Sequence, residues 1–371
     1  MTEQHWYTIK DVEKLDTPAL VIYPHRVKQN IDMVKNMIDD VFRLRPHVKT
    51  HKNGQVTQLM LDAGITKFKC ATIAEAEMLG LNNAPDVLLA YQPGGPKVER
   101  LIQLILTYPA TKYSCLVDNQ RSAKAISDVA IEKNINLNVF IDLDVGMHRT
   151  GILPGNEAVQ LYAYCVELPG ITPVGLHAYD GHIHDPDLIE RTQKSNSSFA
   201  PVLKLQAELK QLGYTEPIIV SGSTPTYSIN AARPNIECSP GTFAYWDRGY
   251  QSAFSDEPFL TAALVVARVI SLPTPTTLCI DCGHKSIASE SELSKRIYFL
   301  NAPELKMKGH SEEHLVADAG GNHHYQVGDV LYGLPWHICP TVALYERVTT
   351  IENNTITGEW LNIARDRKIT I

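Results

Sequence analysis

An apolar run that begins at Val41 passes into a polar loop through the stretch Arg45-Pro46-His47-Val48-Lys49-Thr50-His51-Lys52. A helical pattern of apolar residues follows Gly54. This order predicts a strand over residues 41–48 and places Lys49 at its C-terminal end. A lysine there is partly desolvated, which favours the neutral amine and its use in Schiff-base chemistry. The alternative is a solvated lysine in a basic loop.

Short β-rich apolar runs alternate with amphipathic helical patterns through most of the first 250 residues. The runs cover residues 41–48, 67–72, 87–91, 113–117, 137–143, 172–178, 217–221 and 236–243. Near-continuous apolar strands separated by helices favour a parallel sheet covered by helices. Eight such units predict an α/β fold of the (β/α)8 TIM-barrel type. An open, doubly wound sheet is the alternative.

The pattern changes after residue 255, where strand-like runs are separated by Pro, Gly and Asn. These runs cover residues 264–270, 276–281, 296–299, 313–317, 330–334, 342–351 and 355–360. Such a segment is large enough to form its own core. We therefore predict an N-terminal segment, residues 1–22, that packs with the β domain, a barrel over residues 23–255, and a C-terminal all-β domain over residues 256–371.

Composition argues against several classes of partner. The 34 basic and 41 acidic residues give a mildly negative chain, and no run of Lys or Arg could follow a phosphate backbone, so nucleic acid is not expected. The longest apolar stretch, residues 260–267, is too short to span a bilayer. The first residues show no secretory pattern, and 7 scattered cysteines are typical of a reduced protein. We expect a cytoplasmic protein without a membrane partner.

Polar residues gather at the predicted C-terminal ends of the strands, where a parallel barrel builds its active site. Lys49 follows the first strand, Arg149 the fifth and Tyr179 the sixth. Other polar residues at these ends are His51, Asp142, Asp144, His148, His177, Asp180 and His182. The clustering predicts an active site at this end of the barrel.

The loop at residues 221–226, Ser-Gly-Ser-Thr-Pro-Thr, offers hydroxyls and open backbone N–H groups just before a predicted helix. Such a loop can hold a phosphate, and Gly241 lies in a late-barrel position that could serve the same site. The alternative is an ordinary helix N-cap.

His337 and Cys339 are two residues apart in a segment that we predict to be extended, so both side chains would leave on one face. One imidazole and one thiolate suit zinc and would leave coordination positions open, as in a catalytic site. The alternative is a buried cysteine beside a structural histidine.

Together these residues resemble the fold-type III pyridoxal-phosphate enzymes, which have an alanine-racemase-like barrel and a C-terminal β domain. The resemblance is strongest to the D-threonine aldolase and D-serine dehydratase group and covers nearly the whole chain. It rests on residues 45–52 and on Asp16-Thr17-Pro18, Gly146-Met147-His148-Arg149-Thr150-Gly151, Tyr179-Asp180-Gly181-His182, Asp281-Cys282-Gly283-His284-Lys285 and Ser311-Glu312-Glu313-His314.

The resemblance implies roles for individual residues. Lys49 would bind pyridoxal 5'-phosphate covalently and, with Tyr179, act in catalysis. Arg149 would approach the pyridine nitrogen and leave it unprotonated, and Tyr179 would also line the ring. The other implied cofactor-binding residues are His47, Gly222, Ser223, Thr224, Gly241 and Thr242.

The resemblance also implies that His337 and Cys339 bind a divalent metal beside the cofactor. His-x-Cys is the dehydratase pattern, whereas aldolases tend to carry a carboxylate at the second position, and a thiolate favours zinc over manganese or magnesium. The expected function is a pyridoxal-phosphate- and zinc-dependent lyase that dehydrates a D-serine-type substrate, working as a homodimer on a small D-3-hydroxy amino acid. A D-threonine aldolase is the main alternative, followed by an amino acid racemase and a non-catalytic cofactor carrier.

Overall fold

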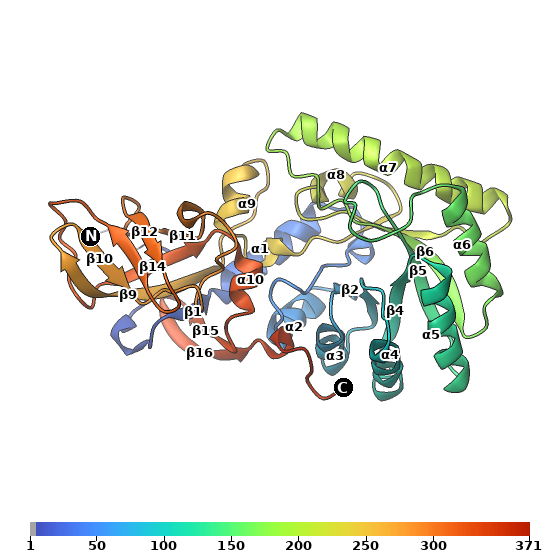
Figure 1. Cartoon of the computed structure of the whole chain (residues 1–371), viewed down its shortest axis with the longest axis horizontal. Helices are drawn as coiled ribbons and strands as arrows, with labels where there is room; N and C mark the ends of the chain where they lie inside the picture. The colour runs from blue at the N-terminus through green and yellow to red at the C-terminus, as the bar shows by residue number, and fades with distance from the viewer. Residues whose placement is uncertain (1–4) are drawn as a thin grey trace. The chain divides into compact units, whose positions relative to one another are not determined.

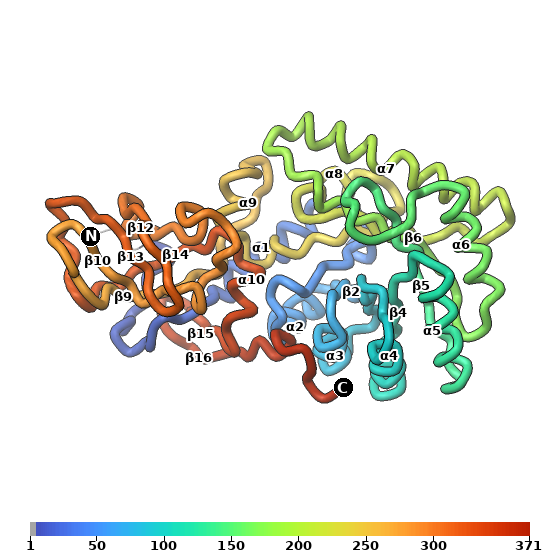
Figure 2. Tube along the Cα trace, in the orientation of Figure 1, coloured from blue at the N-terminus to red at the C-terminus, as the bar shows by residue number. Residues whose placement is uncertain are grey.

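The computed structural model describes residues 5–371, so the first four residues of the predicted N-terminal segment lie outside the description. Two compact units can be distinguished, and each is built from several chain segments (Figures 1 and 2). The barrel unit comprises Asp32–Lys49, Val56–Gly241 and Asp366–Ile371. The β unit comprises residues up to Ile31, Thr50–Gln55 and Thr242–Arg365. The chain therefore passes from one unit to the other directly after Lys49.

The barrel unit contains a seven-stranded parallel sheet whose strands follow one another in sequence order. The strands are β2 (Lys67–Cys70), β3 (Asp86–Leu89), β4 (Lys112–Val117), β5 (Leu137–Leu143), β6 (Ile171–Ala178), β7 (Ile218–Ser221) and β8 (Ile236–Cys238). Leu88, Leu116, Phe140 and Val220 form an apolar cluster contributed by four of these strands.

Residues 44–48 connect the two edge strands of this sheet. On one side, the N–H groups of Arg45 and His47 donate to the carbonyls of Cys238 and Pro240, at 2.9 Å in both cases. On the other, Val48 N–H donates to Lys69 O at 2.9 Å and Lys69 N–H donates to Pro46 O at 2.8 Å. The predicted alanine-racemase-like (β/α)8 barrel is thereby confirmed.

The first predicted strand differs from the observed structure in form. A 3-10 turn occupies Val41–Arg43, and only isolated bridges, Leu44 to Cys238 and His47 to Lys69, follow it. Pro46 explains part of the difference, because it has no N–H to contribute to a continuous ladder. The predicted eighth strand is also shorter, since β8 ends at Cys238 and a 3-10 turn covers Thr242–Ala244.

Helices follow the strands and cover the outer face of the sheet (Figure 1). They are α2 (Gly54–Asp62), α3 (Ile73–Leu81), α4 (Pro96–Thr107), α5 (Gln120–Glu132), α6 (Asn156–Glu167), α7 (Leu188–Gln211) and α8 (Tyr227–Ala231). Side-chain caps fix several starts: Thr72, Asn119 and Asp187 each accept a hydrogen bond from the backbone N–H three residues later. The helix α1 (Pro24–Asn36) precedes them.

The β unit is built on a mixed nine-stranded sheet, which confirms the C-terminal β domain. Its strands are β1 (Ala19–Ile22), β9 (Ala263–Thr274), β10 (Thr277–Ile280), β11 (Ile297–Phe299), β12 (Lys306–His310), β13 (Leu315–Asp318), β14 (Val330–Pro335), β15 (Arg347–Glu352) and β16 (Thr355–Leu361). The N-terminal β1 pairs antiparallel with β9 and parallel with β15. Short helices α9 (Arg248–Ala253) and α10 (Ile338–Val342) complete the unit, with 3-10 turns at Val12–Lys14, Leu293–Lys295 and Ile363–Arg365.

The single strand predicted over residues 342–351 is wrong, because its first residue ends α10 and β15 begins only at Arg347. The strands β1 and β12 were not predicted from the sequence. Within residues 5–371, no helix combines the length and the apolar character needed to cross a bilayer.

Candidate active site

Three cationic side chains surround the ring of Tyr179, which lies directly after β6. The Nζ atoms of Lys49 and Lys69 are each 5.6 Å from the ring centroid, and the guanidinium carbon of Arg149 is 5.1 Å from it. All four residues belong to the barrel unit. The structure therefore brings together three residues predicted from the sequence, Lys49, Arg149 and Tyr179, and adds Lys69.

A cavity of about 630 Å³ opens at the C-terminal ends of the early barrel strands. Lys49, His47 and Arg149 line it, together with Gln92 and Asp118. His47 also receives a hydrogen bond from the backbone N–H of Lys49 at its Nδ1, at 3.2 Å. The cavity has the size of a small-molecule site, and its polar groups come from several different strands, as is usual for a barrel enzyme.

Asp142 and His177 form a buried pair on β5 and β6. The Nδ1 of His177 is 2.7 Å from Asp142 Oδ1, and Gln92 Nε2 donates to Asp142 Oδ2 at 2.7 Å. Burial lowers the pKa of His177 in spite of the opposing hydrogen bond to Asp142, so the imidazole is neutral near pH 7. Its Nε2 is buried and has no hydrogen-bond partner among the described residues. The Nε2 atom of His177 is thus a buried hydrogen-bond acceptor without a donor among the described residues.

Lys69 is almost completely buried on β2, with 1% of its surface exposed. Burial, followed by the charge of Lys49, lowers the pKa of Lys69 to about 7. Sequence reasoning missed this residue. The available signal was the pair Lys67 and Lys69 within an otherwise apolar β-run, because residues two apart in a strand share a face.

The predicted phosphate loop follows β7. Gly222 has φ +88°, a conformation that a side chain would strain, and a Cβ there would meet the amide nitrogen of Asn230 at 2.7 Å. The hydroxyl of Thr226 accepts from Ser223 N–H at 3.1 Å and donates to Asp180 Oδ1 at 2.9 Å. The loop is therefore held in shape by its own side chains.

The segment after β8 reaches the same loop, because Gly241 N–H donates to Thr224 Oγ1 at 2.9 Å. The hydroxyl of Ser239 is buried and has no hydrogen-bond partner among residues 5–371. Hydroxyls and a glycine backbone around an unpartnered hydroxyl are compatible with a bound phosphate group. Thr242 belongs to the β unit, whereas the other predicted phosphate ligands belong to the barrel unit.

The predicted extended conformation around His337 and Cys339 is wrong. His337 is the N-cap residue of α10 and Cys339 lies inside this helix. The side chains nevertheless interact, because burial lowers the pKa of His337 but the hydrogen bond and negative charge of Cys339, with Glu290, raise it to about 9. The imidazole of His337 is therefore protonated near neutral pH in the absence of a metal.

Hydroxyl groups and carboxylates surround this pair. Cys339 Sγ is 3.2 Å from Oγ1 of Thr50 and 3.8 Å from Oγ1 of Thr242. His337 Nδ1 is 2.6 Å from Glu290 Oε1, so Nε2 is the ring nitrogen that could coordinate a metal. Among the described residues no group of three or more His, Cys, Asp or Glu could hold a metal ion. An imidazole and a thiolate suit zinc with open positions.

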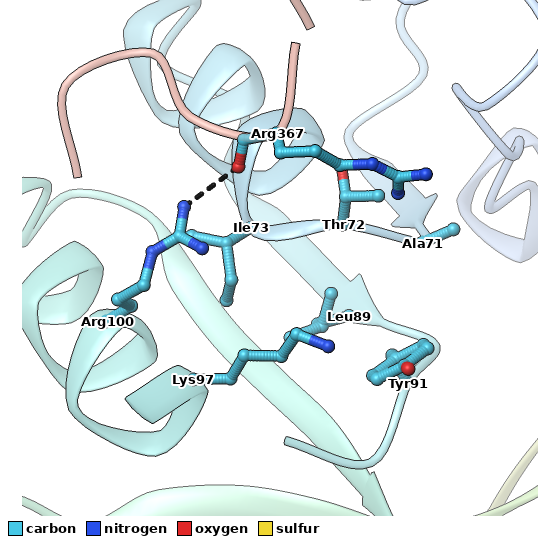
Figure 3. Close-up of a pocket in the computed structure, with 8 residues that line it drawn as sticks. All are labelled: Ala71, Thr72, Ile73, Leu89, Tyr91, Lys97, Arg100 and Arg367. Carbon is cyan, nitrogen blue, oxygen red and sulfur yellow. Dashed lines mark hydrogen bonds between the residues drawn. The ribbon is translucent and has the colours of Figure 1, made fainter. Parts of the chain in front are cut away.

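A second, smaller cavity of about 320 Å³ adjoins the first and was not anticipated from the sequence (Figure 3). It shares Tyr91 and Arg367 with the larger cavity and adds Lys97 and Arg100. These cations are already engaged: Arg100 donates to Arg367 O at 3.0 Å and to Ile371 O at 2.6 Å, and Lys97 Nζ lies 4.5 Å from the ring centroid of Tyr91. The close-up shows the C-terminal segment held against α4 by Arg100 (Figure 3).

Comparison with known families agrees with this arrangement. Residues 22–248 match the alanine racemase N-terminal domain, and residues 262–351 match the putative serine dehydratase domain. The chain belongs to the alanine racemase N-terminal domain family and is a fold-type III pyridoxal-phosphate enzyme. It is a pyridoxal-phosphate-dependent lyase with a serine-dehydratase-like second domain.

Individual relatives cover nearly the whole chain. The D-threonine aldolase of an Arthrobacter species is 26% identical over 360 residues, which is 95% of this chain and 93% of that protein. The crystal structure of D-threonine aldolase from Filomicrobium marinum matches with a TM-score of 0.85 at 24% identity, over 94% of this chain and 95% of that one.

The third comparison is with a dehydratase. D-threo-3-hydroxyaspartate dehydratase from Delftia sp. HT23 has a TM-score of 0.82 at 23% identity, over 94% of this chain and 98% of that one. Two of its mutants match at the same TM-score and 22% identity: one has a histidine replaced by alanine, and the other, described as metal-free, has the cysteine two positions later replaced by alanine. These structural matches establish the fold.

Proposed function

We propose that the chain is a dehydratase for D-3-hydroxy amino acids of the D-serine type, with pyridoxal 5'-phosphate on Lys49 and zinc on His337 and Cys339. The observation that carries the proposal is the interacting imidazole and thiol, with Cys339 Sγ 3.2 Å from the hydroxyl of Thr50. Thr50 directly follows Lys49 in the chain. Cys339 therefore contacts the residue that follows the proposed cofactor lysine in the chain.

The residues of the barrel unit suit this cofactor. Lys49 would hold it, Tyr179 and Arg149 would flank its ring, and His47 would position the lysine backbone through the 3.2 Å hydrogen bond at Nδ1. The phosphate would be held by Gly222, Ser223, Thr224, Gly241 and Thr242. When bound, pyridoxal phosphate withdraws electrons from the α-carbon of an attached amino acid and so acidifies its α-proton.

Lys49 then has two tasks. It would hold the cofactor until the substrate amine takes its place, and its freed amine would then accept the proton from the α-carbon. The phenol ring of Tyr179, whose centroid is 5.6 Å from the Lys49 amine, would restrict which face of the substrate Lys49 can reach. Loss of the 3-hydroxyl and hydrolysis of the product give a keto acid and ammonia.

The metal pair supports the choice of a dehydratase. Zinc at His337 and Cys339 would act as a Lewis acid toward the 3-hydroxyl, which is a poor leaving group at neutral pH. Glu290 would fix the imidazole so that Nε2 coordinates the metal. The metal-free cysteine mutant of D-threo-3-hydroxyaspartate dehydratase supports a cysteine ligand in a relative with the same fold.

A D-threonine aldolase is the second candidate, because a relative with this name is aligned over 95% of the chain. It would use the same residues but would break the bond between Cα and Cβ. The two reactions give different products. With D-threonine and zinc, the proposal predicts a keto acid and ammonia, whereas equal amounts of glycine and acetaldehyde without a keto acid would establish the aldolase. Product analysis by chromatography, with D-serine in parallel, decides between them.

A further inference from the structure

We propose that Lys69 is a positioning residue of the cofactor site, whose positive charge beside Lys49 sets the ionisation of the Lys49-bound cofactor. The inference rests on the proposed function only in taking Lys49 as the cofactor lysine. It assigns a role to a buried group that the steps described for Lys49 do not use.

The backbone fixes Lys69 beside the cofactor segment. Lys69 N–H donates to Pro46 O at 2.8 Å and its carbonyl accepts from Val48 N–H at 2.9 Å, so β2 is joined directly to the chain that leads into Lys49. Lys69 is the bridge partner of His47, which lines the cavity together with Lys49. The amines of Lys49 and Lys69 are each 5.6 Å from the centroid of the Tyr179 ring. Both therefore lie at the same aromatic side chain.

The neighbouring strand position provides a contrast. Lys67 is on the same face of β2 and forms an ion pair with Glu237, which also pairs with Arg45 at 2.7 Å. Lys69 forms no ion pair with any residue among those described. Lys67 is thus neutralised by its own partner, whereas the charge of Lys69 has no dedicated counter-ion.

The two carboxylates nearest in charge effect to Lys69, Asp142 and Asp180, are hydrogen-bonded to other side chains. Asp142 is bonded to His177 and Gln92 at 2.7 Å each. Asp180 is bonded to Thr226 at 2.9 Å. These carboxylates still favour a protonated Lys69 through their charge, while Arg45 and Lys49 oppose it.

These opposing charges and the burial of Lys69 bring its pKa close to physiological pH. Burial and the charge of Lys49 lower the pKa of Lys69 to about 7, so the amine is partly neutral at physiological pH. His177, which is neutral, lies within electrostatic reach of Lys69, and Arg149 lies at the Tyr179 ring. Pyridoxal phosphate brings negative charge on its phosphate and its phenolic oxygen. In its presence Lys69 would take up a proton from solvent and hold a buried positive charge at the ring of Tyr179, within electrostatic reach of Lys49.

A buried cation at this place disfavours a second positive charge on the Lys49 nitrogen. Substitution of Lys69 by methionine removes the cation with little change in side-chain length. The bound cofactor should then hold its proton to higher pH, and the cofactor, which is an anion, should bind less tightly. Substitution by arginine retains the charge and should preserve both properties.

The experiment is a pH titration of the visible absorbance of the purified, cofactor-loaded protein in the absence of substrate. In Lys69→Met the midpoint should rise by about one pH unit and the dissociation constant of pyridoxal phosphate should increase about tenfold. Lys69→Arg and the matched control Lys67→Met should titrate like the parent protein. If Lys69→Met does not fold, as judged by circular dichroism, Lys69→Gln is expected to show the same shift.

The possible outcomes separate this inference from the proposed function. A midpoint and a dissociation constant in Lys69→Met, or in Lys69→Gln, equal to those of the parent protein overturn the inference while the cofactor on Lys49 stands. A parent protein that forms no visible band with pyridoxal phosphate overturns the assignment of Lys49 itself. Neither result depends on which substrate is turned over.

Discussion

His51 shows how a single buried side chain couples the stability of this chain to pH. Its imidazole is completely buried, its Nδ1 accepts from Asn53 N–H at 3.2 Å, and burial lowers the pKa of His51 to about 3. The unfolded chain, with an ordinary histidine pKa near 6.5, binds a proton that the folded chain excludes. Folding stability is therefore fully present above about pH 6.5 and is lost as the pH falls from there toward 3.

We expect His51→Gln to remove this dependence. Between about pH 7.5 and pH 5, the parent protein should lose about 2 kcal/mol more unfolding free energy than the variant. Urea denaturation followed by circular dichroism at both pH values measures the difference. His148→Gln, at a side chain that is 78% exposed, is the control and should behave like the parent. Identical pH dependence in the parent and His51→Gln would contradict the assignment of a buried neutral imidazole.

Cys339 allows a second test at the scale of one residue. The Cys339→Ala variant should lose bound zinc and keto acid production, and a chelator should produce the same loss in the parent protein, reversed by added zinc. The visible absorbance of the cofactor should persist in both cases, because Lys49 is in the barrel unit and Cys339 in the β unit. Metal content is measured by atomic emission, with Cys279→Ala as the control. A Cys339→Ala variant with full dehydratase activity and no metal would show that the thiol is only structural.

At the scale of elements, the close approach of neighbouring strands leaves no room for a side chain at Gly175 on β6. A Cβ there would overlap the carbonyl oxygen of Ile218 on β7 and the ring of Phe140 on β5. We expect Gly175→Ala to destabilise the protein by about 1–3 kcal/mol, because the backbone of β7 cannot give way without disturbing the sheet. Gly94→Ala, with open space around the added methyl group, is the matched control. Urea denaturation compares the two, and equal stability would contradict the close packing of β6 against β7.

The same scale shows what the sequence could predict and what it could not. Strand β5 was predicted with its observed bounds, Leu137–Leu143, because its apolar run is long and its flanks are polar. The sequence predicted a continuous first strand over residues 41–48, but the structure has only isolated bridges there. Hydropathy alone does not show that Pro46 lacks the N–H that a continuous strand needs. His337 and Cys339 were predicted as a pair, but the helix α10 that contains Cys339 was not. A helix of five residues is too short to show a helical period in the sequence.

Site residues could be predicted from the sequence where a chemically reactive side chain follows a predicted strand. Lys49, Arg149 and Tyr179 each follow a strand predicted from the sequence, and they meet in the structure. Lys69 could not be recognised in this way, because it lies within a strand and owes its properties to burial and to neighbours distant in sequence. The hydrogen bond of Asp142 to His177 likewise depends on the pairing of β5 with β6.

For the whole molecule, we predict a homodimer in which the β unit of one subunit contributes to the active site of the other. The resemblance to fold-type III pyridoxal-phosphate enzymes implies this arrangement. A physical reason supports it, because the cavity at Lys49 is open and the reactive product of elimination has to be protected from solvent until it is released. Sedimentation equilibrium at micromolar concentration should give twice the mass of the 41.3 kDa chain. A fully active monomer would contradict this prediction.

The central claim is that Lys49 carries pyridoxal phosphate, and borohydride reduction followed by peptide mapping tests it most directly. Reduction fixes the cofactor on the lysine that holds it, and mass spectrometry of the digested protein identifies that lysine. The account predicts the added mass on Lys49, with Lys52 and Lys69 unmodified, and no visible absorbance band in Lys49→Ala. Label on Lys52, on Lys69 or on any lysine other than Lys49 would contradict the account.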